Sequence, residues 1–415
     1  MIKNGIVYND DLPWVFQISK AQGSFIWDHH EKKYIDFTSG WNVANLGFNN
    51  PEITAAVIEQ VTTNHYAPMW TSDVIQEHYA AELTHALHSS LNTICRATSG
   101  TEANEMAIKI ARASTGRKKI IGFTNAYHGQ SLATLALSYS EKALEKIGPL
   151  PAQFVQFQFP SKNSITGDIT ELLSQFYSDL EKTLENQDIA AIVLEACMVT
   201  GSGTAYVTEP GFLSEVRRLT KKYGTLMILD EVGTGFSRCG SLFAHELYEV
   251  VPDILTLAKA ISNGVAAMAA VVVNEKLIEP TLPYINITST FGWTPIACAA
   301  ASATLKIHQR DRVFDQAKTK GEWLLNELRH KLANHPKVGN IQGIGLEVGV
   351  SFVINRAKGA ADKDFAAEVV RKALDNGLHI TCCSQNVIQL MPPLIIQESV
   401  LQEGLEMFIR SIVDV

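Results

Sequence analysis

The chain has 415 residues, of which 46% are hydrophobic and 19% charged, a composition typical of a folded protein with a large core. Its formal net charge of −8 and the absence of a basic cluster argue against a nucleic-acid partner. No apolar run approaches the roughly 20 residues that span a bilayer, and the N-terminus has no apolar signal core, so we expect a cytoplasmic protein without a membrane partner.

The first predicted element is a β-hairpin around residues 29–32, within FIWDHHEKKYIDF. From about residue 50 to residue 305, short apolar runs alternate with amphipathic stretches such as 101–114 and 211–224. The apolar runs are NTICRAT, KKIIGFT, AAIVLEA, TLMILDE, DILTLAK and MAAVVVN. Continuous apolar strands that alternate with helices predict an α/β fold, in which helices cover both faces of a mainly parallel sheet.

Beyond about residue 306 the pattern changes. It predicts, in order, a long helix over 313–335, a strand over 344–353, a helix over 365–377, a strand over 387–391 and a last helix. This is a smaller α+β unit, which we expect the N-terminal segment to complete. The predicted regions are therefore an N-terminal segment 1–49 that contributes to the small domain, a large domain 50–305 and a C-terminal small domain 306–415.

Polar residues follow five of the apolar runs at the point where each run ends. They are Ser99-Gly100-Thr101 before a helix, Tyr127-His128-Gly129, Glu195, Asp230 and Lys259. Ligands of open α/β sheets bind outside the carboxyl ends of the strands, so we expect these side chains at one rim. Together they offer a helix N-terminus for an anion, an aromatic ring, two carboxylates and an amine.

Each of these residues also has a plainer interpretation. Ser99 or Thr101 can be an ordinary helix cap, Asp230 can form a structural pair with Arg238, and Lys259 can extend out to water. Tyr127 can simply fill a gap in the core. The combination favours pyridoxal phosphate, because a phosphate site, a ring stacker, an acid for a ring nitrogen and an amine are its requirements. Burial would lower the pKa of Lys259 and make it a nucleophile that forms a Schiff base.

Several motifs carry a resemblance to a known family. They are WDHHEKKYIDF, NLGFNNPEI, SGTEANEMAIKIAR, AYHGQS, LDEVGTGFSRCGSLFA, LAKAISNG, TFGWTPIACAAA and MPPL. With them, nearly the whole chain resembles the class III pyridoxal-phosphate-dependent aminotransferases of fold type I, which include ornithine, acetylornithine and omega-amino-acid aminotransferases. The resemblance implies a seven-stranded large-domain sheet, pyridoxal 5′-phosphate as cofactor, and a homodimer with shared active sites.

The resemblance also implies a role for each site residue. Lys259 would carry the Schiff base and then move the proton at the substrate carbon, while Asp230 would hold the ring nitrogen. The remaining cofactor contacts would be Ser99, Gly100 and Thr101 at the phosphate, Tyr127 and Val232 on the two ring faces, His128 beside Tyr127, Glu195 near the phenolic oxygen, and Thr290 at the phosphate of the partner subunit.

Two departures from the family pattern concern the substrate. Gln389 stands where members that handle glutamate often have an arginine, and Thr200 stands where a gating glutamate pairs with it. Both charges are absent together, which argues against glutamate as amino donor and against an ornithine- or acetylornithine-type activity. Trp14, Trp41 and Trp70, with Tyr66, suit an apolar substrate, although each is equally explained as a core or interface residue.

The resulting prediction is an aminotransferase of EC 2.6.1 type that moves an amino group from an amine or amino acid to a 2-oxo acid. A racemase or epimerase is the alternative, since Lys259 and a second acid could return the proton to the other face of the carbon. A non-catalytic binding protein on the same fold is a third, weaker hypothesis. Six scattered cysteines without CxxC spacing predict free thiols in a reducing compartment and no metal site.

Overall fold

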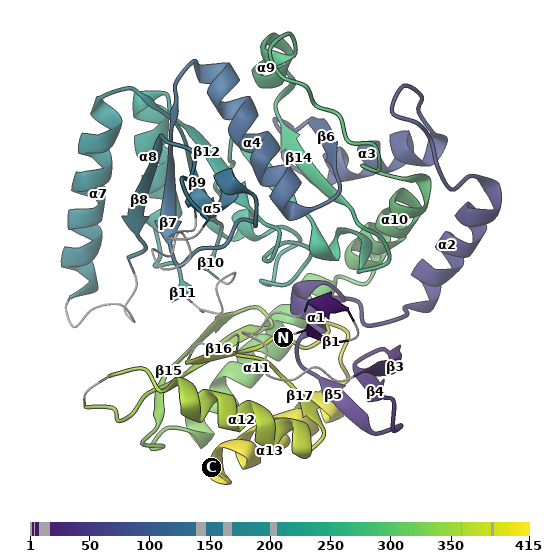
Figure 1. The fold of residues 1–415 in the computed structure, drawn as a ribbon. Coiled ribbons are helices and arrows are strands. Elements are labelled where there is room, and N and C mark those ends of the chain that lie inside the picture. The colour runs from purple at the N-terminus through teal and green to yellow at the C-terminus, as the bar shows by residue number, and fades with distance from the viewer. Residues whose placement is uncertain are drawn as a thin grey trace.

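The computed structural model describes residues 2–3, 5–7, 17–137, 147–160, 168–199, 206–357, 359–382 and 386–415. Figure 1 shows an upper part built on one large sheet and a lower part that combines C-terminal elements, in yellow and green, with N-terminal strands in purple. Among the described helices, none is both long enough and apolar enough to cross a membrane.

The upper part contains the seven-stranded sheet. Its strands, in spatial order, are β6 (Thr93–Ala97), β14 (Ala269–Val273), β13 (Ile254–Leu257), β12 (Leu226–Asp230), β9 (Ile189–Glu195), β7 (Lys119–Thr124) and β8 (Phe154–Gln158). Neighbouring strands from β13 to β8 pair in parallel, whereas β14 is antiparallel to both of its neighbours. All seven residues of β9 are buried, as expected for a strand covered on both faces.

Successive side chains of these strands enter two different cores. Ile192 and Leu194 of β9 pack with residues of α7 (Ile169–Glu185) and α8 (Phe212–Tyr223). Ala191 and Val193 pack instead with the apolar face of α4 (Gly100–Thr115). The alternation follows from the two-residue period of a strand. The upper part also contains α2 (Pro51–Thr63), α3 (Val74–Ala86), α5 (Leu132–Leu137), α9 (Glu275–Ile278), α10 (Pro295–Arg310) and the 3₁₀ helices η1 (Ala244–Tyr248), η2 (Lys259–Ser262) and η3 (Glu279–Thr281).

The lower part has two small sheets and three helices. One sheet is β15 (Val338–Ile344), β16 (Glu347–Phe352) and β18 (Val387–Leu390), and the other is β17 (Leu378–His379), β5 (Lys33–Asp36), β4 (Phe25–Asp28) and β3 (Ile18–Gln22). The helices are α11 (Val313–Lys331), α12 (Lys363–Asp375) and α13 (Glu398–Val413). Because β5 pairs in parallel with β17, the N-terminal segment and the C-terminal elements share one sheet. The shortest elements are β1 (Ile2–Lys3), β2 (Ile6–Val7), α1 (Ser39–Asn42), β10 (Met198–Val199) and β11 (Tyr206–Val207).

The predicted α/β class is confirmed, and each of the six apolar runs contains a strand of the large sheet. The predicted hairpin around residues 29–32 is formed by β4 and β5. The long helix expected over 313–335 ends at Lys331. The division into 1–49, 50–305 and 306–415 stays a prediction, and α10 runs across its second boundary.

Candidate active site

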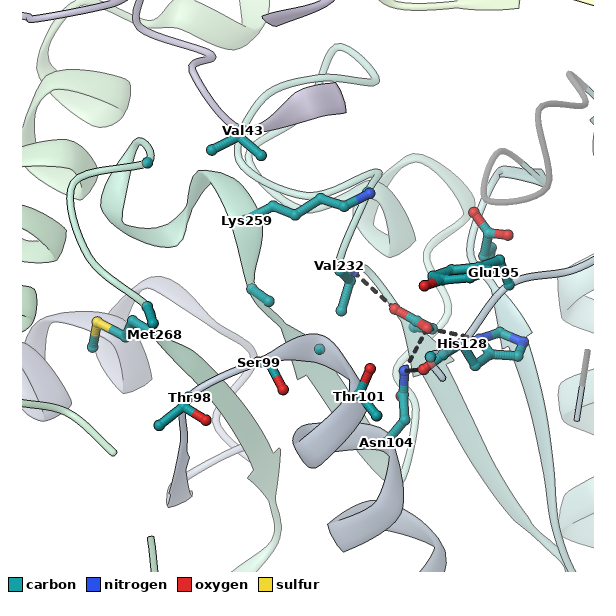
Figure 2. A pocket seen from close by; sticks show the side chains of 18 of the residues that line it. Val43, Thr98, Ser99, Thr101, Asn104, His128, Glu195, Val232, Lys259 and Met268 are labelled. Atoms are coloured by element: carbon teal, nitrogen blue, oxygen red, sulfur yellow. Dashed lines mark hydrogen bonds and ion pairs between the residues drawn. The ribbon is translucent and has the colours of Figure 1, made fainter. Parts of the chain in front are cut away.

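A cavity of about 400 Å³ opens where the strands of the large sheet end. Figure 2 shows Lys259, Val232 and Glu195 around it, with Ser99 and Thr101 at the start of α4. The sequence-predicted residues that line it are Ser99, Gly100, Thr101, Tyr127, His128, Glu195, Asp230, Val232 and Lys259. Residues from five separate segments of the chain therefore meet at one cavity.

The N-terminus of α4 forms one wall. Ser99 has an extended backbone and caps the helix, because its hydroxyl accepts a hydrogen bond from the backbone N–H of Glu102 at 3.2 Å. The N–H groups of Gly100 and Thr101 lie in the first turn, where a helix offers them no internal acceptor. A side chain at Gly100 would put its Cβ 3.0 Å from the methyl carbons of Val232. The capped helix therefore still presents an N-terminus that suits an anion.

Asp230 lies at the end of β12 and is 2% exposed. Its Oδ2 accepts hydrogen bonds from His128 Nδ1 at 2.7 Å and from Asn104 Nδ2 at 2.8 Å, and its Oδ1 accepts one from the Val232 N–H at 2.9 Å. Thr256 in turn donates to Asn104 Oδ1 at 2.9 Å. Three donors therefore fix the orientation of this carboxylate, and the alternative pairing with Arg238 does not occur.

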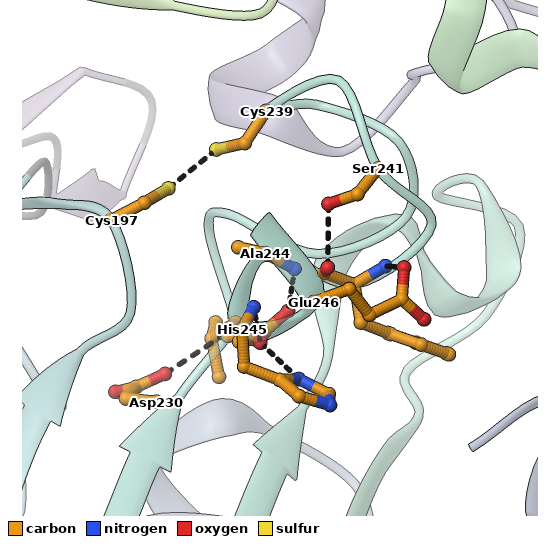
Figure 3. A network of polar contacts seen from close by, with 10 residues as sticks. Cys197, Asp230, Cys239, Ser241, Ala244, His245 and Glu246 are labelled. Atoms are coloured by element: carbon orange, nitrogen blue, oxygen red, sulfur yellow. Dashed lines mark hydrogen bonds and ion pairs between the residues drawn. The ribbon is translucent and has the colours of Figure 1, made fainter. Parts of the chain in front are cut away.

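The residue after Asp230 has a different task. Glu231 is fully buried and accepts hydrogen bonds from the N–H groups of Ala244 and His245 at 2.6 and 2.8 Å, and its carboxylate is 2.7 Å from His245 Nδ1. Figure 3 shows this network beside Cys197 and Cys239, two buried thiols whose sulfur atoms are 3.0 Å apart. The side chains of two consecutive residues point in opposite directions, as in a strand, so Asp230 faces the cavity and Glu231 faces this network.

Lys259 follows β13 and begins η2 with a φ of 48°, in the left-handed region that a residue with a side chain rarely adopts. Its side chain lies along the cavity instead of extending to the surface. Burial lowers the pKa of Lys259, while the negative charges of Glu195, Glu347 and Asp230 act in the opposite direction. The lowered pKa increases the share of free amine, which is the nucleophilic form.

Other predicted residues lie away from this cavity. Thr290 is exposed, Trp70 is 82% exposed, Trp41 is partly buried and Gln389 is buried, and none of the four lines it. Trp14 and Thr200 fall outside the described residues. Tyr127, by contrast, is 40% exposed and lines the cavity, so it does not fill a gap in the core.

Sequence reasoning missed several lining residues. Asn104 is the most informative, since it is a buried amide within the apolar face of α4, a placement that requires a polar partner. Val43 reaches the cavity from the N-terminal segment, where its sequence gives no chemical signal. The remaining missed residues are Thr98, Gly233, Ala258, Gly264, Ala266, Ala267 and Met268, whereas Gly129, expected at the rim beside His128, does line the cavity.

The lining residues fit a flat aromatic ligand that carries an anionic tail, a ring nitrogen and a carbonyl group. The helix N-terminus suits the anion, and the buried carboxylate of Asp230 suits a protonated nitrogen. The amine of Lys259 suits the carbonyl. Any residue larger than glycine at position 100 would press against the methyl groups of Val232, so glycine lets the helix N-terminus and Val232 lie close together on the cavity wall.

Comparison with known proteins gives a consistent result. A model of the family Aminotransferase class-III matches residues 6–412. Acetylornithine aminotransferase of Bacillus anthracis is 32% identical over 388 residues, which cover 94% of this chain and 92% of that protein. The structure of an (S)-enantioselective omega-transaminase from Thermomicrobium roseum has a TM-score of 0.90 at 29% identity and covers 96% of this chain and 92% of its own. Ornithine aminotransferase of Toxoplasma gondii, solved with partial occupancy of PLP at its active site, has a TM-score of 0.86 at 26% identity and covers 97% of this chain and 91% of its own.

Proposed function

The chain belongs to the class-III aminotransferase family, and on that premise we propose that it moves an amino group from an amine or amino acid to a 2-oxo acid with Lys259 as the residue that binds the carbonyl of pyridoxal 5′-phosphate. Class-III aminotransferases are PLP-dependent enzymes of EC 2.6.1 type. The observation that carries the assignment of residues is that Lys259, Asp230 and the N-terminus of α4 line the same cavity.

When bound, pyridoxal phosphate supplies an aldehyde that condenses with amines and a ring that withdraws electrons from the substrate carbon. Gly100 and Thr101 bind the phosphate with their N–H groups, and Ser99 fixes the helix that presents them. Asp230 keeps a proton on the ring nitrogen, because His128, Asn104 and Val232 hold its carboxylate in place.

Lys259 has two tasks in this proposal. Its amine would bind the cofactor carbonyl in the resting enzyme, and during turnover the same amine would act as the base that removes and returns a proton at the donor carbon. Both tasks require an unprotonated amine, which agrees with the direction of its pKa shift. Tyr127 and Val232 cover the ring faces, and Glu195 lies at the edge of the cavity near Asp230.

We further propose a homodimer in which Thr290 contributes to the site of the partner subunit. Thr290 is exposed beside Phe291, which is 64% exposed and whose ring centroid is 6.0 Å from that of Tyr66. Trp70 lies a few residues beyond Tyr66 and is also exposed. Exposed large apolar side chains that gather in this way are typical of an interface. A cytoplasmic location is proposed because the five described cysteines are free and buried.

The test is a half-reaction without acceptor. We mix the wild-type holoenzyme with single amines and amino acids and follow the visible absorbance of the cofactor, then add pyruvate or 2-oxoglutarate. A donor should bleach the band and the acceptor should restore it. If the band persists while the optical rotation of a chiral donor decays, the enzyme is a racemase and the proposal is wrong.

Lys259→Ala should lose the visible band and all transfer activity while it stays folded. Lys320→Ala is the matched control, because Lys320 is a partly buried lysine of α11 whose pKa burial also lowers, and it lies away from the cavity. It should keep both the band and the activity. An active, coloured Lys259→Ala enzyme would contradict the assignment.

A further inference from the structure

Glu347 is a buried carboxylate that the proposed mechanism does not use. It begins β16, where Gly349 pairs with Gln389 of β18. Val348, Val350 and Phe352 alternate with it and pack in the core of the lower part. Because side chains of a strand alternate, Glu347 lies on the opposite face of this sheet, the face that also carries Gln389. Its exposed fraction is 0%.

The hydrogen bonds of Glu347 are incomplete. Its Oε2 accepts a hydrogen bond from Asn42 Nδ2 at 3.0 Å, whereas its buried Oε1 has no hydrogen-bond partner among the described residues. Asn42 is 1% exposed, and its Oδ1 has no partner either. Since Nδ2 of Asn42 donates to a group that accepts, the orientation of this amide is determined. The pair therefore presents two unpaired buried acceptors side by side.

The positive charges around Glu347 neutralise only part of the negative charge of its carboxylate. Arg238 donates to the oxygens of Leu346 and Pro392 and to side chains of Ser39 and Asn45, but not to Glu347. Burial raises the pKa of Glu347, and the positive charges of Arg238 and Lys259 offset part of that rise. Burial and, to a smaller extent, the negative charge of Glu347 raise the pKa of the Cys197 and Cys239 thiols. Of the two positively charged residues, Lys259 lines the cavity.

The backbone that positions Asn42 is strained. Ser39, Gly40, Trp41 and Asn42 have φ values of 47°, 59°, 67° and 61°, so four successive residues are left-handed. Asp36 holds the turn by accepting from Thr38 Oγ1 and the Ser39 N–H, both at 2.7 Å. Backbone strain of this kind concentrates at functional sites. The turn leads directly into Val43, which lines the cavity.

We propose that Asn42 and Glu347 form a subsite that binds a second amino group of the donor, so that diamines are preferred over amines that end in a methyl group or a carboxylate. An ammonium group supplies the N–H donors that Oδ1 of Asn42 and Oε1 of Glu347 lack, and its positive charge neutralises the negative charge of the carboxylate. A donor carboxylate would meet Glu347 as a like charge and be rejected. The inference rests on the proposed aminotransferase function.

The experiment compares three donors of equal length with the wild-type holoenzyme: 1,5-diaminopentane, n-pentylamine and 5-aminopentanoate, with shorter and longer diamines alongside. The readout is kcat/KM and the donor concentration that half-bleaches the cofactor band. The diamine should be the best of the three. In Glu347→Gln, the kcat/KM ratio of diamine to pentylamine should fall about 10- to 100-fold, which is the usual effect of losing a charged hydrogen bond. The loss should lie mainly in KM, since the subsite does not touch the reacting carbon.

The matched control is Glu246→Gln, which removes another carboxyl whose pKa burial raises, but one that lies in η1 beside His245 and Glu231 and on which the charge of Lys259 does not act. It should leave the donor ratio at its wild-type value. If Glu347→Gln fails to fold, Asn42→Gly replaces it, because glycine accepts the positive φ and removes one of the two acceptors. It should lower the same ratio by a smaller factor.

Two results overturn the proposal. One is a wild-type enzyme that does not prefer the diamine to pentylamine. The other is a Glu347→Gln enzyme in which all three donors lose the same factor, which would make Glu347 a structural counter-charge for Arg238. Neither of these results would contradict the proposed aminotransferase function. That function is contradicted by a different result, namely that no donor bleaches the cofactor band of the wild-type enzyme.

Discussion

At the scale of single residues, the carboxylate of Asp230 is the best-defined group of the site. Three donors point at it, and two of them, on His128 and Asn104, share one oxygen. An amide at this position would keep the shape of the side chain but lose its charge, and its NH₂ group would face donors. The ring nitrogen of the cofactor would then no longer be held protonated.

We therefore expect Asp230→Asn to retain cofactor but to lower kcat/KM about 100- to 1000-fold, as for the loss of a group that stabilises transition-state charge. The measurement is steady-state transfer to pyruvate together with the cofactor spectrum. Asp253→Asn is the control, since Asp253 precedes β13 and is paired with Arg217 at 2.5 and 2.9 Å away from the cavity. It should lower the melting temperature and leave kcat/KM near the wild-type value. Equal losses in both variants would contradict the role of Asp230.

The residues of this cavity were predictable to the extent that strand ends determine them. Asp230 and Lys259 each end an apolar run, and the ends of parallel strands meet at one rim whatever the loops do. Asn104 depends on the rotation of α4 about its axis, which a polar residue on an apolar face signals only weakly. The left-handed φ of Lys259 and of the turn before Val43 could not be read from the sequence, because tertiary contacts impose them.

At the scale of elements, η1 is tied to the end of β12 by the pair of His245 and Glu231. Figure 3 labels His245 of η1 and Asp230, the residue before Glu231. Burial by itself lowers the pKa of His245, but the adjacent carboxylate more than offsets this, so that its pKa is raised above 6.5. A histidine whose pKa is raised on folding stabilises the protein most at pH values below 6.5 and loses that effect as pH rises through the folded-state pKa.

The melting temperature of His245→Gln should thus fall furthest below that of the wild type under mildly acidic conditions, and the gap should narrow toward alkaline pH. His308 provides a contrast of opposite sign, since burial first, and then Arg238, lower its pKa to about 3. Its neutral ring stabilises the fold above pH 6.5, and that contribution falls as pH decreases toward 3. If the difference in melting temperature between the wild type and His245→Gln instead grew as pH rises, the raised pKa of His245 would be refuted.

Arg238 connects elements from both parts of the molecule. Its guanidinium, fully buried, donates to the carbonyl oxygens of Leu346 and Pro392 and to the side chains of Ser39 and Asn45 at 2.6–3.2 Å. Removing it leaves four buried acceptors without a donor. We expect Arg238→Leu to lower the free energy of unfolding by at least about 3 kcal/mol, as for the loss of one partner in a buried charged network.

Chemical denaturation of the holoenzyme measures this loss. Arg310→Leu is the control, because Arg310 is exposed and pairs with Glu52 and Asp311 at the surface. Surface ion pairs contribute little, so its denaturation midpoint should hardly move. An Arg238→Leu enzyme as stable as Arg310→Leu would show that the connection is dispensable.

Elements were predictable where burial is complete and less so at the edges. All residues of β9, and all residues of β12 after Leu226, are buried, so these apolar runs stand out in the sequence. The edge strand β8 reads FVQFQ, with two glutamines and a half-buried pattern, and was missed. The direction of a strand is harder to predict than its presence. The run MAAVVVN, which contains β14, is as apolar as the parallel strands of the sheet, although β14 runs antiparallel to its neighbour β13.

At the scale of the whole molecule, the exposed aromatic side chains Trp70 and Phe291 predict that two copies of the chain associate. A double variant, Trp70→Glu with Phe291→Glu, would place charges in that interface and should convert the dimer to a monomer with weaker cofactor retention. Analytical ultracentrifugation and the cofactor spectrum measure the two effects. Ile354→Glu, in the lower part and 53% exposed, is the control and should remain dimeric. A monomeric wild-type enzyme would contradict the prediction.

The pairing of β5 with β17 also bears on how the protein is made. His379 Nδ1 lies 2.7 Å from Asp36 Oδ1, although the two residues are 343 positions apart in the chain. At a synthesis rate of 5–20 residues per second, the N-terminal strands wait about 15 to 70 seconds on the ribosome before their last partner emerges. Over that interval the backbone groups at the edge of β5 are unpaired and can pair with strands of other nascent chains. We therefore expect the yield of folded enzyme to depend on chaperones that bind nascent chains and prevent their aggregation.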